Sequence, residues 1–104
     1  MQPLTLPTIM PLPHNPTESD LVRLMQRIDF RAWRGALVPI RDIRKVAGPF
    51  PKIALDWLIL SAARKGLISL HRHDFPSILT EQEKTDMIPA PDGLFYVGAA
   101  IRQS

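Results

Sequence analysis

Proline placement is the feature that most constrains how this chain can fold. Five of its eleven prolines fall within residues 1–16, where neither a helix nor a central strand can persist. His14 is the only titratable side chain in this segment, yet apolar residues stand between its prolines. We therefore expect residues 1–16 to form an extended, polyproline-like arm that lies on the domain or on a second subunit.

The rest of the chain, residues 17–104, is expected to form a single domain. A length of 104 residues suffices for one compact core and not for two. No apolar run approaches the roughly 18 residues that a membrane helix requires, so no membrane partner is expected. The chain has no cysteine, which excludes disulfides and thiol chemistry and fits the reducing conditions of the cytoplasm.

The first helix is expected over residues 18–33. Thr17 can accept a backbone N–H at the start of this helix, where acidic residues also suit the positive helix end. Gly35 is expected to stop it. Trp33 is expected to close the core beneath the helix; partial exposure beside the arginines is the alternative. Apolar residues at helical spacing form its buried stripe: Leu21, Leu24, Met25 and Ile28.

Two further helices are expected on either side of a Gly-Pro turn. A β-prone stretch at residues 36–38 leads into a helix over residues 40–47, which ends at Gly48. Pro51 suits the first turn of a third helix, because its missing N–H costs nothing there. This helix is expected to continue to about Lys65. Its core face consists of Leu55, Leu58, Ile59 and Ala62.

The C-terminal part of the chain is expected to contain two strands. Residues 67–71 and 94–101 carry the β-branched and aromatic residues that favour a pleated surface. Between these strands Thr80 and Glu83 fit a capping box, which predicts a short helix near residues 81–88.

This order of elements resembles the winged-helix variety of helix-turn-helix domains over roughly residues 18–102. The most similar stretch is residues 38–70, including the sequence AARKGLI that leaves the third helix. The resemblance implies an α+β fold, a three-helix bundle with a small antiparallel sheet, whose wing is the loop 72–93. It also implies that the third helix enters the DNA major groove. The residues nearest the bases would then be Lys52, Ile53, Asp56 and Trp57.

Charge is distributed unevenly along the chain. Residues 23–72 hold eleven Lys/Arg and three Asp, a balance of +8, whereas residues 73–93 have a balance of −4. The basic part predicts salt-sensitive contacts with the phosphates of nucleic acid, most simply double-stranded DNA; a solvated basic surface is the alternative. The acidic wing is not expected to bind DNA. The expected phosphate-binding residues are Arg31, Arg34, Arg41, Arg44, Lys45 and Lys52.

The third helix carries an apolar row on the side away from its core face. Ile53, Trp57 and Leu60 form this row, where a base-reading helix would present Arg, Asn or Gln. Such a row predicts a protein interface, covered by the N-terminal arm, a second copy of the chain or another protein. Stacking of Trp57 on an unpaired base is the alternative.

Chemistry-bearing motifs are few. His71 and His73 would point to the same face of a strand and could share a metal ion. The third ligand would have to be Asp74, His14 or a carboxylate of the acidic loop, and hydrogen bonding at the base of the wing explains the two histidines better. There is no glycine-rich phosphate loop and no recognisable nucleophile setting, so we expect neither catalysis nor a cofactor. The sequence predicts a dimeric winged-helix protein that binds nucleic acid, such as a small transcriptional regulator; the alternative is a winged-helix protein-interaction module.

Overall fold

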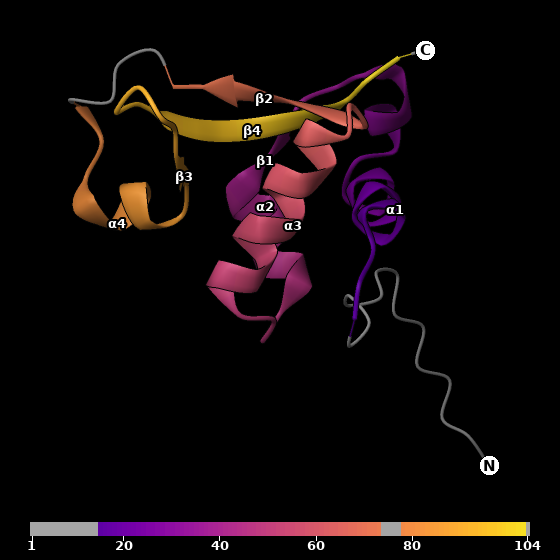
Figure 1. Cartoon of the computed structure of the whole chain (residues 1–104), viewed down its shortest axis with the longest axis horizontal. Helices are drawn as coiled ribbons and strands as arrows, with labels where there is room; N and C mark the ends of the chain where they lie inside the picture. The colour runs from indigo at the N-terminus through magenta and orange to yellow at the C-terminus, as the bar shows by residue number, and fades with distance from the viewer. Residues whose placement is uncertain (1–14, 74–77, 104) are drawn as a thin grey trace.

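The computed structural model describes residues 15–73 and 78–103. The predicted arm, apart from its last two residues, and Asp74 lie outside the described residues. The described part is α+β, with helices and a small antiparallel sheet (Figure 1). Its elements are α1 Glu18–Ile28, the 3-10 turn η1 Phe30–Arg34, β1 Val38–Pro39, α2 Ile40–Ala47, α3 Lys52–Arg64, β2 Ile68–Arg72, α4 Glu81–Thr85, β3 Ile88–Pro89 and β4 Phe95–Ile101.

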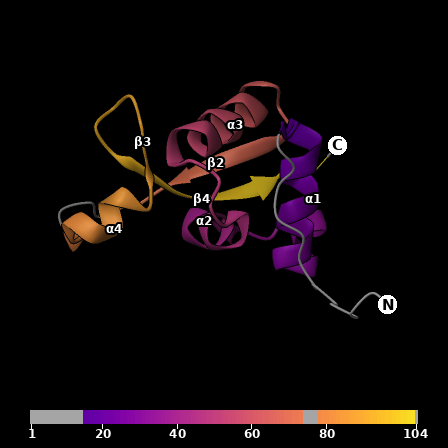
Figure 2. The same cartoon turned by 90° about the horizontal axis from the view of Figure 1, so that it is seen from below.

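The sheet is built around β4. β2 pairs with one edge of β4, and β1 and β3 pair with the other, all of them antiparallel. Ala99 of β4 lies between Val38 of β1 and Leu70 of β2. The helices α1, α2 and α3 cover one face of this sheet, as Figures 1 and 2 show. The core therefore lies between three helices and a sheet of short strands.

The first helix begins as predicted but ends earlier. The Asp20 N–H donates to Thr17 Oγ1 at 3.2 Å, and the Thr17 N–H donates to Asp20 Oδ2 at 2.8 Å, which completes a capping box. At the other end Asp29 is extended, and its carboxylate accepts the backbone N–H of Arg31. The prediction of one helix through residue 33 is wrong, because the short Asp29 side chain caps a separate turn, η1.

The two central helices agree with the prediction. α2 occupies residues 40–47, and α3 begins directly after Pro51. Gly48 joins them with φ 67° and ψ −130°, a backbone conformation that is essentially restricted to glycine. The expected core face of α3 is buried.

The core draws on every layer of the domain. Its largest fully buried side chains are Leu21, Met25, Val38, Ile40, Ile43, Leu55, Ile59, Ile68 and Ile88. Trp33 is not among them: 53% of it is exposed, so its predicted place in the core is wrong. The reason is the early end of α1, since in η1 it is Ala32 that turns inward and is fully buried.

Residues 78–94, the described part of the chain between β2 and β4 after the gap, include a short helix and a strand that pairs with β4. Thr80 and Glu83 form the predicted capping box, and α4 follows it. α4 is shorter than expected because Ile88 leaves it to pair with Tyr96 as part of β3, a strand that was not predicted. Among the described helices, none has both the length and the apolar character needed to cross a bilayer.

Candidate functional site

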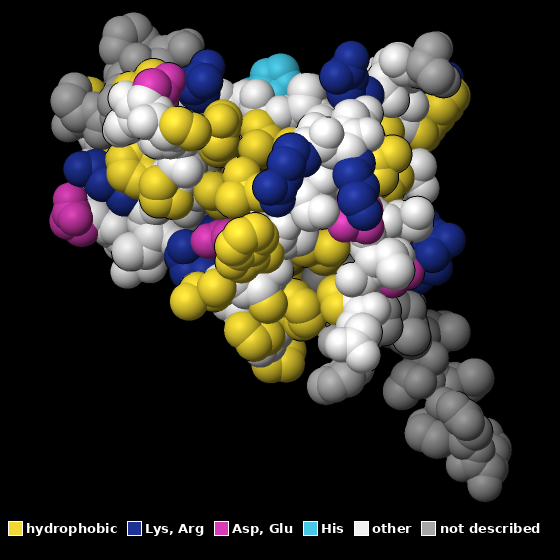
Figure 3. Space-filling view, in the orientation of Figure 1, with side chains coloured by type: hydrophobic (Ala, Val, Ile, Leu, Met, Phe, Trp, Pro, Cys, Tyr) yellow, Lys and Arg dark blue, Asp and Glu magenta, His cyan; other side chains and the backbone are white. Residues whose placement is uncertain are grey.

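The outer face of α3 carries an exposed apolar patch. Ile53 is 73% exposed and Trp57 63% exposed, one helical turn apart. Leu60, the third residue of the predicted row, is half-buried and packs against the core. Figure 3 shows hydrophobic side chains gathered at the lower end of the molecule, where α2 meets α3. We call Ile53 and Trp57 the α3 patch.

Two of the predicted phosphate-binding cations are paired with one carboxylate next to the α3 patch. Arg44 Nη2 lies 2.6 Å from Asp56 Oδ1, and Lys52 Nζ lies 3.0 Å from Asp56 Oδ2. The Arg44 side chain is only 13% exposed, because its Nε–H also donates to the Asp86 carbonyl at 2.9 Å. Arg44, which the sequence suggests as a phosphate-binding residue facing solvent, therefore turns inward to these partners instead.

The other predicted cations fall into two groups. On η1, Arg31 is paired with Asp29 at 2.9 Å, and the Arg34 guanidinium lies 4.7 Å from the centre of the Trp33 ring. On α2, Arg41 and Lys45 are exposed. The six residues thus come from η1, α2 and the first turn of α3, where Lys52 shares Asp56 with Arg44.

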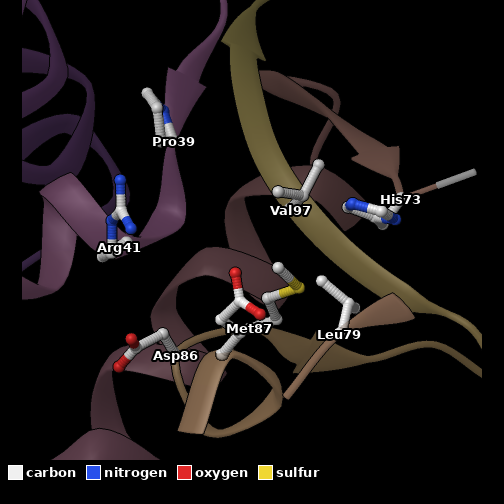
Figure 4. Close-up of a pocket in the computed structure, with 8 residues that line it drawn as sticks. Pro39, Arg41, His73, Leu79, Asp86, Met87 and Val97 are labelled. Carbon is white, nitrogen blue, oxygen red and sulfur yellow. The ribbon is translucent and has the colours of Figure 1, made fainter. Parts of the chain in front are cut away.

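A pocket of about 290 Å³ lies between the start of α2 and the wing. Figure 4 shows Arg41 and His73 on opposite sides of it, with Met87 and Leu79 at its base. Glu83 also lines the pocket. Its pKa is lowered mainly by the backbone N–H and side chain of Thr80, and further by the nearby charges of His73 and Arg41. Charges of both signs offset each other here, so the pocket favours neither an anion nor a cation.

The two histidines have different surroundings. His71 Nε2 lies 3.4 Å from Ser69 Oγ on the exposed end of β2, whereas His73 lines the pocket. The described residues contain no group of three or more His, Cys, Asp or Glu side chains that could hold a metal ion. Asp74 and His14, two of the third ligands considered from the sequence, are outside the described part of the chain.

The η1 turn forms a second exposed surface that the sequence interpretation missed. Phe30 is 76% exposed and lies three residues before Trp33. The sequence does not single out Phe30, and for Trp33 it favours the core over exposure beside the arginines, which is the arrangement found. The signal was present as two aromatic residues spaced by three, the period of a 3-10 helix, with an arginine after each.

Comparison with known proteins gives no match to a family model, to a curated protein or to a solved structure. Three candidate surfaces remain, and their chemistry alone indicates what each could bind. They are the α3 patch, the pocket beside the start of α2 and the η1 turn.

Proposed function

We propose that this protein is a winged-helix-like domain that binds protein through the outer face of α3, with a second copy of the chain as its partner. The observation that carries the proposal is the exposure of Ile53 and Trp57 on a helix whose opposite side is buried in the core. The β1–β4–β2 strand order and the position of α3 after a Gly-Pro turn support the winged-helix arrangement.

The side chains of α3 suit protein better than duplex DNA. In a winged-helix arrangement the N-terminal half of α3 would face the bases. Its one cation, Lys52, is already paired with Asp56, and that carboxylate would be repelled by phosphates. Ile53 and Trp57 do not provide the bidentate donors that read base edges. Exposed tryptophan, by contrast, is characteristic of the residues that contribute most to protein interfaces.

A second copy fits because the charges around the α3 patch cancel. In a two-fold symmetric contact the same surface meets itself, so any net charge would face a like charge. Here two cations are balanced by two carboxylates. Arg44 and Lys52 are the cations, and both contact Asp56 on α3. Asp86 is the second carboxylate, and it lines a pocket together with Arg44 and Lys52. An apolar patch with no net charge can therefore pair with its own copy.

Sedimentation equilibrium of the purified chain over a range of concentrations tests this proposal. We expect a concentration-dependent dimer for the wild type and a monomer for Trp57→Gln. Trp33→Gln is the matched control, since it removes the chain's other tryptophan, which is also exposed but on η1. It should dimerise like the wild type. A wild-type chain that stays monomeric at every concentration would refute the proposal.

Nucleic-acid binding is the second candidate function. The observation in its favour is the segment 23–34, which contains four arginines and one aspartate, all four arginines being exposed. Cations of this kind release counterions from phosphates, so binding should weaken steeply as salt rises. Titration of labelled duplex and single-stranded oligonucleotides at low and high salt tests it; duplex binding would support a role in transcription regulation.

A further inference from the structure

The η1 turn sorts its side chains into three rows. A 3-10 helix has three residues per turn, so side chains at positions i and i+3 lie above one another. Phe30 and Trp33 therefore form one row, and Arg31 and Arg34 form the next. Ala32, on the third side, is fully buried. Both the aromatic row and the arginine row consequently face solvent, side by side.

Neighbouring groups hold the arginine row in place. Arg31 donates from Nε to Asp29 Oδ1 at 3.1 Å and from Nη2 to Asp29 Oδ2 at 2.9 Å, a two-pronged contact that fixes the plane of the guanidinium. The Arg34 guanidinium lies over the Trp33 ring. Gly35 ends the turn by donating its N–H to the Ala32 carbonyl. The two rows are thus preorganised in the free protein.

We propose that η1 binds single-stranded nucleic acid, with unpaired bases stacking on Phe30 and on the Trp33–Arg34 layer and phosphates contacting the arginines. Aromatic faces beside cations are the common device of single-strand binders, because every base has a face that can stack. A guanidinium plane offers the same kind of surface as an aromatic ring. The proposal rests on the second candidate function and adds to it the site and the class of nucleic acid.

Single strands fit η1 better than a duplex does. The bases of a duplex are stacked on one another and expose only their edges, which are read by hydrogen-bonding side chains in a groove. Phe30 and Trp33 have large faces to offer, and the phenyl ring of Phe30 has no donor for a base edge. The charge of the segment, with four arginines against Asp29, suits a polyanion.

A membrane surface fits η1 less well. Helices that lie in a membrane interface present a continuous apolar face over many turns and gain affinity from its whole area. The five residues of η1 offer two apolar side chains, and the indole of Trp33 already lies against a charged guanidinium. In a single strand of nucleotides, by contrast, the phosphates suit the arginines and the bases suit the aromatic rings.

Fluorescence anisotropy with the full chain tests the proposal. The probes are a labelled twelve-nucleotide oligo-dT, the corresponding oligo-rU and a duplex of equal length. We expect single strands to bind more tightly than the duplex, and Phe30→Ala to weaken single-strand binding about tenfold. Ile78→Ala is the matched control because Ile78 is equally exposed, at 72%, and lies outside η1. It should bind like the wild type.

Two further measurements locate the contact. In a Trp57→Phe background Trp33 is the sole tryptophan, and its fluorescence should be quenched when oligo-dT stacks on it. Arg34→Gln should lower the slope of log affinity against log salt by about one phosphate contact. Phe30, Trp33 and Arg34 are exposed, so each variant should fold, and circular dichroism checks that it does.

The remaining outcomes separate the proposals. Tight duplex binding that Phe30→Ala leaves unchanged would overturn the η1 site and leave nucleic-acid binding standing. Failure to bind any of the oligonucleotides at low salt would overturn both. Binding to vesicles of phosphatidylserine and phosphatidylcholine, without binding to oligo-dT, would assign η1 to a membrane surface and overturn the proposal as well.

Discussion

Arg44 and Asp56 form an ion pair that joins α2 to α3, with Arg44 Nη2 at 2.6 Å from Asp56 Oδ1. The same guanidinium donates to the carbonyls of Asp86 and Met87, so the segment after α4 meets both helices at this one side chain. Its Nη1 is buried without a hydrogen-bond partner among the described residues. Asp86 and Met87, which follow α4, are thereby joined to both helices, and the pair is sensitive to the loss of either member.

Asp56→Ala should destabilise the domain more than Arg44→Met. Without Asp56 the guanidinium keeps its charge in a largely buried place, which costs about 3 kcal/mol. Without Arg44 the carboxylate still has Lys52 at 3.0 Å, and the loss is about 1 kcal/mol from the unpaired carbonyls. Urea denaturation at pH 7 measures both values. The reverse order would show that Arg44 does not depend on Asp56.

Glu18 should give the domain a specific sensitivity to acid. Its carboxylate accepts the Ser61 hydroxyl at 2.7 Å and lies 3.2 Å from Lys65 Nζ. The Ser61 hydroxyl, then the backbone N–H of Glu18, then Lys65 lower its pKa from 4.5 to about 2. A lowered pKa in the folded state means that the stabilisation is complete above about pH 4.5 and is lost as the pH falls towards 2.

The Glu18→Gln variant tests this dependence. Its urea midpoint should be lower than that of the wild type at pH 6, and the difference should shrink to nothing near pH 2, because protonated Glu18 resembles glutamine. Ser61→Ala removes the contact with the largest effect on the pKa and should flatten the acid dependence in part. A difference that stays constant between pH 6 and pH 2 would contradict the assignment.

A side chain at Gly98 should force Leu37 to move from its present position. A Cβ at Gly98 would lie 2.8 Å from Cγ and Cδ1 of Leu37. Gly98 sits in the central strand β4, paired with Pro39 on one side and His71 on the other, so the backbone has little room to move. Gly98→Ala should therefore cost about 2 kcal/mol through overpacking, as measured by thermal or urea unfolding.

The Leu37→Ala substitution supplies the control for Gly98. Leu37 is 45% exposed, so its truncation alone should cost little, and in the double variant the clash at Gly98 disappears. The two changes should then be strongly non-additive, with the double variant more stable than Gly98→Ala alone. Additive losses would mean that the sheet, rather than Leu37, resists the new methyl group.

Features that depend on neighbouring residues were predictable from the sequence. Thr17 and Thr80 each form a capping box with an acidic residue three positions later, and this pattern predicts the start of a helix. Pro51 predicts the start of α3. These signals act within one helical turn, so their outcome does not depend on the rest of the fold. These signals located the helices well enough to predict that Ile53 and Trp57 lie on the outer face of α3.

Features that depend on distant partners were not predictable in the same way. Arg44 turns inward because it donates to the Asp86 carbonyl, 42 residues further along the chain. The helical periodicity of α2 cannot predict such a distant partner. Ile88 joins a strand only because Tyr96 lies opposite it. Trp33 was misplaced by a local competition instead, since Asp29 ended α1 and rotated the following residues. The η1 surface was therefore not predicted, because the first helix was expected to continue five residues beyond its actual end at Ile28.

The direction of the chain between α2 and α3 should depend on Gly48. An added Cβ there would meet no other atom within 4 Å, so the cost of Gly48→Ala is purely that of the backbone, whose φ of 67° and ψ of −130° disfavour any side chain. We expect a loss of about 2 kcal/mol, within the range for such strained conformations.

Gly35→Ala is the control for the conformational cost of placing a side chain at Gly48. Gly35 has φ 92° and ψ 12°, close to the left-handed region that side chains enter at a cost of roughly 1 kcal/mol, and the nearest side-chain atom would be at an ordinary 3.5 Å. Gly48→Ala should therefore be the less stable of the two in urea. If it were equally stable, the turn would have relaxed, and α3 would no longer be held in place relative to α2. Self-association through Trp57 should then weaken, because Ile53 and Trp57 lie on the helix that this turn orients.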